Sequence, residues 1–203
     1  MAKIKFTKGE LKRQREALKQ FTHYLPILQL KKQQLQAEIQ HVHERSNLKI
    51  QEIDSLETGI SEWASLLSEP GDYVSDWIRP KRIRIGEANI AGIDIPTFEG
   101  VDFEKTDYDL FLTPLWVDRA VEKIRELAGL LEEEKILREQ KKILGHELRI
   151  TTQRVNLFEK IKIPEARENI RLIRIYLGDQ QTNAVGRSKI AKNKIEKLEE
   201  VLV

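Results

Sequence analysis

The chain has 203 residues, of which 33% are charged and 6% are aromatic, and its formal net charge is +2. High charge combined with long runs of Leu, Ile, Glu, Lys, Arg and Gln is typical of coiled-coil proteins. The absence of cysteine excludes disulfides, thiolate-bound zinc and cysteine nucleophiles. The basic N-terminus has no apolar core and no stretch is apolar enough to span a bilayer, so we expect neither a signal peptide nor direct membrane insertion.

An apolar 3-4 register runs without a skip from Leu11 to Leu67. Thirteen of its seventeen positions are apolar, with Lys, Gln, Glu and Arg between them. A seam of 3.5-residue period held this long predicts a left-handed coiled coil. The register ends where Pro70, Gly71 and Pro80 follow.

The next segment changes character, because isoleucines alternate with polar residues in KRIRIGEANIAGIDIPTFEGVDFE. Alternation punctuated by turn residues predicts a small β-hairpin within residues 80–113. The turn residues are Gly86, Gly92, Pro96 and Gly100.

Helical spacing returns in the last third, where Thr113 is a plausible N-cap and Pro114 suits the first helical position. After Phe158 the apolar row slips by one residue. It continues at Ile163, Ala166, Ile170 and Ile173. Pro164 lies just after the slip, and a proline inside a helix costs roughly 3 kcal/mol and usually bends it.

A helix, a hairpin and a second long helix predict an all-α fold: a long antiparallel two-helix coiled coil with a small β-hairpin subdomain at the helix-connecting end. We divide it into residues 1–79 (N-terminal helix), 80–113 (hairpin connector) and 114–203 (C-terminal helix) of one continuous domain. With a midpoint near residue 97, residue i would face residue 193 − i. This register would bring Trp77 level with Trp116. It would also place Pro26 and Pro164 at one height, where they would form one shared bend.

Three stretches resemble the D subunit of the V-type and A-type rotary ATPases. QRVNLFEKIKIPEARENIRLIRIYL (153–177) is similar to the family's C-terminal motif, in which an Arg-Val-Asn-Ala-Leu-Glu run precedes an Ile-Pro and an Ile-rich helix. The matching residues are Arg154, Val155, Asn156, Glu159, Ile163, Pro164 and Ile170. NIAGIDIP (89–96) resembles the central hairpin of the family, and TKGELKRQREAL (7–18) resembles its opening.

The chain also departs from the family pattern. THYLPILQLKKQQL (22–35) stands where the family often has a basic Arg-Gly-His run, so contacts of that run are not carried over. Leu157 replaces the alanine of the C-terminal motif. The chain is therefore identified as a divergent, bacterial-type member.

The resemblance implies a central rotor shaft that performs no chemistry itself and needs no cofactor. Its paired helix ends would enter the ring of catalytic A and B subunits. Its other end would bind the F subunit and a funnel-shaped subunit on the membrane rotor ring. Rotation would couple ATP synthesis or hydrolysis to proton or sodium transport, in a complex on the cytoplasmic side of the inner membrane.

Candidate contact residues follow from this topology. Both ends are basic, and folding back would bring them to one tip, whose positive field suits an acidic collar in the ring. The expected ring contacts are Lys8, Lys12, Arg13, Arg15, Arg187, Lys189, Lys192 and Lys194. The expected stalk-partner contacts are Arg82, Arg84, Asn89, Ile90, Ile93 and Ile95, and the expected bend residues are Pro26 and Pro164.

No catalytic, cofactor or metal site is predicted. GRSK (186–189) lacks the spacing and context of a phosphate loop. The histidines of HVH (41–43) point to different helix faces, and EEE (132–134) is expected on a solvated face.

Two other classes remain as alternatives. A coiled-coil scaffold that tethers other proteins explains the heptads, although not the hairpin or the three ordered motifs. A nucleic-acid-binding helical protein would use the basic tip, but the near-neutral net charge argues against it.

Overall fold

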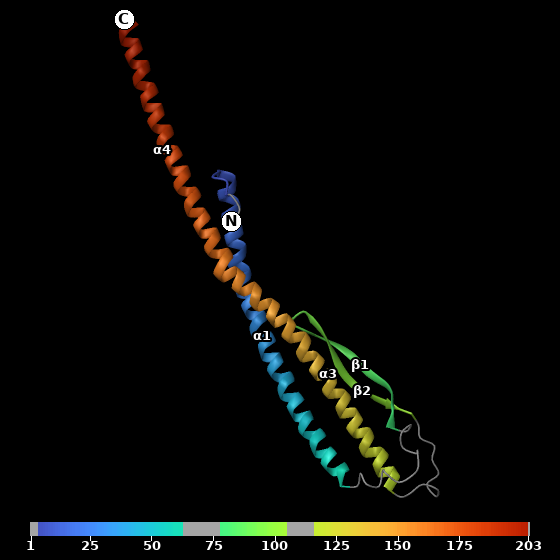
Figure 1. Ribbon diagram of the computed structural model, residues 1–203. Helices are drawn as coiled ribbons and strands as arrows, with labels where there is room; N and C mark the ends of the chain where they lie inside the picture. The colour runs from blue at the N-terminus through green and yellow to red at the C-terminus, as the bar shows by residue number, and fades with distance from the viewer. Residues whose placement is uncertain (1–3, 63–77, 105–115, 203) are drawn as a thin grey trace. The chain divides into compact units, whose positions relative to one another are not determined.

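A computed structural model describes residues 4–62, 78–104 and 116–202 (Figure 1). Its elements are α1 (Lys8–Ser61), β1 (Pro80–Ile90), β2 (Ile93–Phe103), α3 (Trp116–Leu157), the π-helical turn η2 (Phe158–Lys162) and α4 (Ile163–Leu202). Long helices with one small antiparallel hairpin confirm the predicted fold class. The chain forms two compact units, residues 1–30 with 151–203 and residues 31–150, and each is described by itself. The expected contact of Trp77 and the cap at Thr113 lie outside the described residues.

A side-chain cap at Thr7 starts α1. The Thr7 hydroxyl accepts a hydrogen bond from the Glu10 backbone N–H at 3.2 Å, and the Thr7 carbonyl accepts one from Leu11. Glu10 also lies in the first turn, where its charge suits the helix dipole. These local interactions fix the first turn of a helix that runs for 54 residues.

In the unit of residues 31–150, α1 and α3 pack antiparallel through the predicted apolar row. Leu35, Val42, Leu137 and Leu144 form a buried cluster, and Ile95 of β2 joins it. Leu35, Val42 and Leu144 are fully buried. Lys49 bridges the two helices by an ion pair with Glu133 at 3.3 Å.

The hairpin turns at Ala91 and Gly92, which both have positive φ, of 52° and 75°. Two successive positive φ angles in a two-residue loop match the right-handed twist of the strands. Asn89 stabilises the turn, because its side chain accepts a bond from the Gly92 N–H at 3.1 Å and donates one to Asp94 at 2.6 Å.

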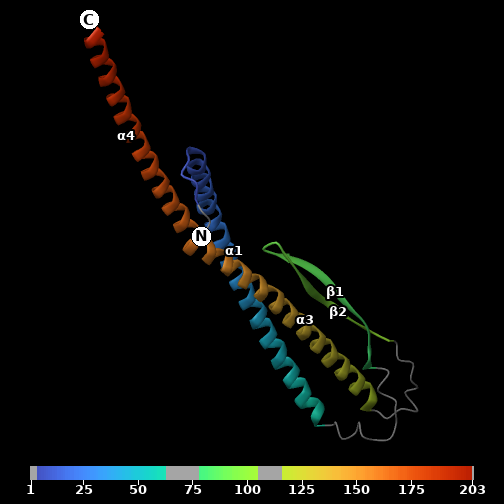
Figure 2. The ribbon, with the colours of Figure 1, turned by 45° about the horizontal axis from the view of Figure 1, so that its top comes forward.

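The hairpin lies alongside α3, as Figures 1 and 2 both show. Near the hairpin tip, the Gln140 amide donates to the Pro96 carbonyl at 2.5 Å. At the other end, Arg125 donates to the Glu104 carbonyl at 2.9 Å and lies 5.2 Å over the Phe103 ring. The hairpin is therefore anchored along several turns of one helix.

The expected pairing of residue i with residue 193 − i is wrong. In the unit of residues 1–30 and 151–203, the ring centroids of Phe21 and Phe158 lie 5.2 Å apart, and the Asn169 side chain donates a hydrogen bond to the Gln14 side chain. The residue numbers of these two pairs add to 179 and 183, whereas the prediction required 193. The prediction put the midpoint near residue 97, whereas the two observed pairs are centred on residues 89.5 and 91.5, close to the hairpin turn at Ala91 and Gly92. The midpoint was therefore placed about six residues too far along the chain.

The corrected register separates the two prolines. Pro26 lies five residues beyond Phe21 and Pro164 six residues beyond Phe158, and the antiparallel helices run in opposite directions from that contact. The prolines therefore lie on opposite sides of the Phe21–Phe158 contact, on the order of 16 Å apart along the axis. With this register the two prolines do not share a single bend.

The π turn explains the slip in the apolar row. A π turn holds one more residue than an α turn, and η2 closes with the Ile163 N–H bonded to the Phe158 carbonyl, five residues back. The row is consequently buried on both sides of the turn. Its buried members are Thr151, Val155, Ile163, Ala166, Ile170 and Ile173. Pro164, which cannot donate a backbone hydrogen bond, follows directly after this interruption of the helical ladder.

Replacing Leu144 by alanine should lower the free energy of unfolding by about 2–5 kcal/mol, because it leaves a cavity between α1, α3 and the hairpin. Leu131→Ala, at a side chain that is 38% exposed on the same helix, should cost under about 1 kcal/mol. Urea unfolding followed by circular dichroism measures both. Equal losses would contradict the assignment of the core.

Candidate functional site

The N-terminal basic residues lie on the first turns of α1. The expected contacts Lys8, Lys12, Arg13 and Arg15 are all exposed, and Lys12 forms a loose pair with Glu16 at 3.9 Å. Lys8, Lys12 and Arg15 are spaced by four and three residues, so they share one face of the helix. They form the first candidate binding surface.

The C-terminal basic residues lie elsewhere. Phe6 packs on Tyr176 with ring centroids 5.0 Å apart, so Phe6, just before α1, lies level with residue 176. Arg187 lies eleven residues farther along α4, on the order of 16 Å away. Lys189, Lys192 and Lys194 lie farther still. The structure therefore does not bring the two basic groups to one tip, because each residue of α1 faces a residue about ten positions earlier in the chain than expected.

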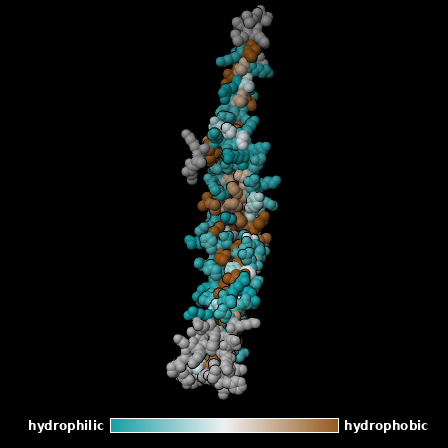
Figure 3. Space-filling model, turned by 90° about the vertical axis from the view of Figure 1, so that its right-hand side faces the viewer, coloured by the Kyte–Doolittle hydropathy of each residue, from teal (hydrophilic) through white to brown (hydrophobic). Residues whose placement is uncertain are grey.

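Between residue 178 and residue 195, α4 is exposed on all sides. Every side chain from residue 178 to residue 195 is exposed, including Val185, Ile190 and Ile195, each more than half exposed. Figure 3 shows such apolar side chains among hydrophilic ones on this part of the surface. A helix cannot bury apolar side chains by itself, so this segment leaves apolar surface open to a partner.

The hairpin presents only part of its predicted contact set. Arg82, Arg84 and Asn89 are exposed, and Arg84 pairs with Asp102 at 3.0 Å. Ile95 is 2% exposed, because strand alternation points it into the core, so in this structure it offers a partner almost no surface. Ile85, 55% exposed, is an outward apolar side chain that the sequence analysis missed.

Ile90 and Ile93 are half-buried and pack against the core cluster. They therefore hold the hairpin tip onto the helices, and only their outer sides could meet a partner.

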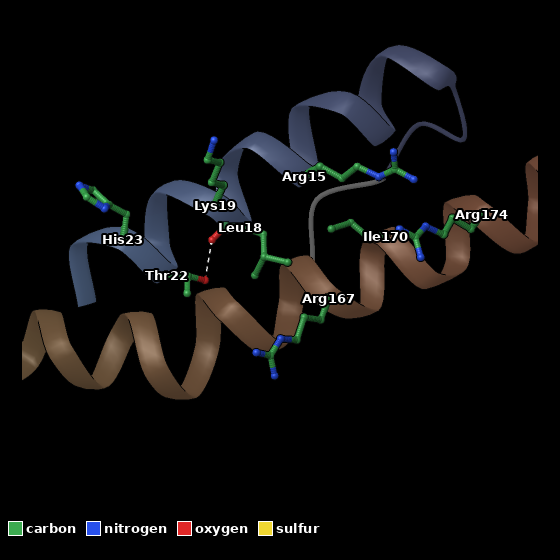
Figure 4. A pocket seen from close by; sticks show the side chains of 8 residues that line it. All are labelled: Arg15, Leu18, Lys19, Thr22, His23, Arg167, Ile170 and Arg174. Atoms are coloured by element: carbon green, nitrogen blue, oxygen red, sulfur yellow. Dashed lines mark hydrogen bonds between the residues drawn. The ribbon is translucent and has the colours of Figure 1, made fainter. Parts of the chain in front are cut away.

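A groove between α1 and α4 lies in the unit of residues 1–30 and 151–203 and has a volume of about 720 Å³. Its lining residues are Arg15, Leu18, Lys19, Thr22, His23, Arg167, Ile170 and Arg174. Figure 4 shows Leu18 and Thr22 directed toward α4, while Arg15 and Arg174 lie toward one end. Of these residues the sequence analysis named Arg15 as a partner contact and Ile170 as a member of the apolar row. The signal that could have found others is the seven-residue spacing of Arg167 and Arg174, which puts them on one helix face.

The charges in this groove are not compensated within the described part of the chain. Arg15, Lys19, Arg167 and Arg174 form no ion pair or hydrogen bond with any residue that the structure describes. Arg171, between the two groove arginines, is different, because it donates two hydrogen bonds to Glu168 at 2.9 and 2.6 Å. These bonds lower the pKa of Glu168 and raise the pKa of Arg171.

The possible metal-binding side chains of the described residues do not form a cluster. No group of three His, Cys, Asp or Glu side chains among them could hold a metal ion. His41 lies 3.7 Å from Glu38, whereas His43 lies 3.2 Å from Lys141. Within the same described ranges, no helix is both long and apolar enough to cross a membrane.

The expectation that residues 132–134 lie on a solvated face is wrong for one of them. Glu134 is 6% exposed and accepts hydrogen bonds from Arg138 at 3.1 and 2.9 Å. It is a buried, ion-paired structural carboxylate.

Comparison with known proteins gives the family. The family model for the D subunit of ATP synthase matches residues 10–193. The chain belongs to the ATP synthase D-subunit family. It is 48% identical to the V-type ATP synthase D subunit of Borreliella burgdorferi over 197 residues, which cover 97% of each chain. It is 33% identical to the protein of that name from Chlamydia felis over 201 residues, 98% of this chain and 97% of the relative.

Two of the three stretches that resemble the D-subunit family coincide with irregular features of the fold. Residues 153–177 contain the π turn and Pro164, while residues 89–96 form the hairpin tip with its positive-φ turn. Both are places where the backbone departs from a plain two-helix coiled coil. In this member of the family, these stretches determine the backbone geometry as well as the surface.

Gln140→Met should loosen the hairpin, because the bond from its amide to the Pro96 carbonyl is lost. We expect a loss of about 1 kcal/mol in the free energy of unfolding, and faster hydrogen exchange in β1 and β2. Gln40→Met is the matched control, since Gln40 bonds to Glu44 on an exposed face of α1. Equal hydrogen exchange in both variants would contradict the anchoring role of Gln140.

Proposed function

We propose that this chain is the central-stalk, rotor-shaft subunit of a V-type ATP synthase or ATPase. It couples ATP synthesis or hydrolysis in a ring of catalytic A and B subunits to proton or sodium transport across the membrane. The protein is itself non-catalytic, and the complex lies peripheral to the cytoplasmic side of the inner membrane. Family membership supports the complex, and the exposed end of α4 supports the shaft.

The end of α4 is the observation that carries the proposal. Val185, Ile190 and Ile195 are between 57% and 59% exposed on a helix that nothing in the described chain covers. Leaving three large apolar side chains in water loses roughly 1.5–3 kcal/mol each relative to burial. A helix inserted into a surrounding ring would bury them on all sides.

The basic residues then divide between two levels of the ring. Arg187, Lys189, Lys192 and Lys194 would lie deeper, along the inserted helix. Lys8, Lys12, Arg13 and Arg15 would lie nearer the ring's opening. Exposed positive charge at both levels favours rapid association with acidic ring surfaces.

The hairpin is proposed to bind the stalk partners, which are the F subunit and the funnel-shaped subunit on the rotor ring. Arg82 and Arg84 supply charge and Ile85 supplies apolar area on its outward face. Gln140 and the buried Ile95 attach the hairpin to the helices, so a partner that binds the hairpin is also attached to the shaft.

Pro26 and Pro164 are proposed to bend the shaft at two separate heights. Each removes one helical hydrogen bond, and the π turn before Pro164 adds a second interruption. An off-axis end could press on the catalytic interfaces in turn.

The proposal predicts that a tagged chain recovers A, B and F subunits from solubilised native membranes in stoichiometric amounts. A variant with Val185→Asp, Ile190→Asp and Ile195→Asp should recover the A and B subunits at least about tenfold less well, because each charge would be desolvated in the ring. Mass spectrometry of the bound proteins measures the recovery.

The matched control is Leu48→Asp with Ile50→Asp, which adds charge at two exposed positions of α1. It should recover the A and B subunits like the unaltered chain. Recovery of an unrelated partner in place of the ATPase subunits, or equal recovery by the tail variant, would contradict the proposal.

A further inference from the structure

We propose that residues 4–7, which we call the N-terminal strap, brace the C-terminal helix where η2 and Pro164 interrupt it. With the strap in place, this interruption is a stiff part of the helix and not a hinge. The inference concerns the chain itself. Only its consequence, that a braced shaft transmits torque without bending here, rests on the proposed function.

The helix that follows α3 is weakest between Phe158 and Pro164. The five residues of η2 form a π turn, a rare geometry that occurs mostly as a single turn inside α-helices. Pro164 is the second residue of α4, and it donates no backbone hydrogen bond to the turn before it. Both π turns and prolines are usual places for a helix to kink. Two interruptions within seven residues therefore predict a hinge, unless a contact from outside supports the helix.

The strap turns back before α1 begins, as Figures 1 and 2 both show. A hydrogen bond of 3.0 Å from the Thr7 N–H to the Lys5 carbonyl closes this reversal. A bond between residues two apart defines a γ-turn, which is common where a loop begins. Because the Thr7 hydroxyl also caps α1, the strap is tied to the first turn of that helix.

Two apolar side chains of the strap face the C-terminal helix. Phe6 packs on Tyr176, with ring centroids 5.0 Å apart, and each residue is only 42% exposed. Ile4 is half-buried and lines a hollow of about 470 Å³ at the same helix. The other residues that line this hollow are Lys160 and Ile161 of η2, and Glu165, Glu168, Asn169 and Leu172 of α4. The strap therefore reaches the helix on both sides of Pro164.

The sequence suits both partners of this contact. The strap reads Ile-Lys-Phe at residues 4–6, and this alternation places two apolar side chains on one side of an extended segment. On the helix, Ile161 and Leu172 are eleven residues apart, which is about three turns, and Tyr176 follows one turn later. These three residues share a face that is exposed outside the buried row. The strap thus covers part of a second apolar face of the helix.

Contact on a second face is what resists bending. The seam with α1 supports one side of the interruption and leaves the helix free to bend toward or away from its other side. A bend at Pro164 would move Ile161 relative to Leu172, so the hollow that Ile4 lines would open and its apolar surface would meet water. The Phe6–Tyr176 contact holds the strap twelve residues beyond Pro164, where it is anchored independently of the hinge.

The test is hydrogen exchange of the full chain, followed by mass spectrometry of the peptides that cover residues 158–170. The variant Ile4→Ser with Phe6→Ser removes both apolar contacts and keeps the cap at Thr7. We expect the amides of residues 160–169 to exchange about tenfold faster, because local opening at the interruption is no longer opposed. Exchange around Leu35 and Leu144, in the other unit, should stay unchanged and so show that the variant is folded.

The matched control is Tyr24→Ser with Ile27→Ser, which also replaces an aromatic residue and an isoleucine at exposed positions of the same unit. Neither residue lines the hollow, so exchange at residues 160–169 should stay within about twofold of the unaltered chain. The variant Ile4→Val with Phe6→Tyr keeps the apolar contacts and should stay within the same limit.

Unchanged exchange at residues 160–169 in the serine variant of the strap, or an equal increase in the Tyr24 and Ile27 control, would overturn the inference. Loss of protection in the conservative variant would also overturn it. A chain that shows the strap-dependent protection but does not recover the A and B subunits would refute the proposed function and leave this inference standing.

Discussion

The antiparallel seam between the long helices is the interaction on which the rest of this structure depends. Neither α1 nor the helices that follow the hairpin can bury an apolar stripe alone, and isolated helices are only marginally stable in water. In one unit the seam is made by Leu35 and Val42 against Leu137 and Leu144. In the other it contains Phe21 against Phe158. Each pairing fixes which charged residues remain outside, and so determines every candidate binding surface.

The π turn is the second constraint, because it keeps the buried seam continuous where the apolar row of the sequence slips by one residue. One extra residue between Phe158 and Ile163 would rotate all later side chains by about 100° on an uninterrupted α-helix. The π turn absorbs that residue, so Ile163, Ala166, Ile170 and Ile173 return to the buried side. The same rotation leaves Arg167 and Arg174 beside the seam, where they line the groove. The groove's charge is thus a consequence of the way the helix keeps its core.

The sequence predicted the elements well and their mutual register poorly. Heptad spacing and alternation depend on neighbours within a few residues, and both the long helices and the hairpin were confirmed. The register depends instead on the residue about which the two helices are paired. The observed pairs are centred close to the hairpin turn at Ala91 and Gly92, whereas the prediction centred them on residue 97. Ile95 and Gln140 hold the hairpin along α3, and nothing in the spacing of either residue shows this.

The candidate surfaces show the same limit. The basic residues at both ends of the sequence are exposed as expected. They lie at different levels of the structure, because each residue of α1 faces a residue about ten positions earlier in the chain than expected. The groove was missed, except for Arg15 and Ile170, because its lining comes from two helices that are far apart in the sequence. The slip in the apolar row was visible in the sequence, whereas the π turn that accommodates it was not predicted.

The most direct test of the account is to watch this protein turn. Because the natural chain has no cysteine, Lys142→Cys on α3 gives a single attachment point for a bead, in a complex whose catalytic ring is fixed to glass. The account predicts that the bead rotates in one direction when ATP is added and stops when ATP is removed. A bead that stays still while the same complexes hydrolyse ATP would place the chain in the stationary part of the machine and contradict the central claim.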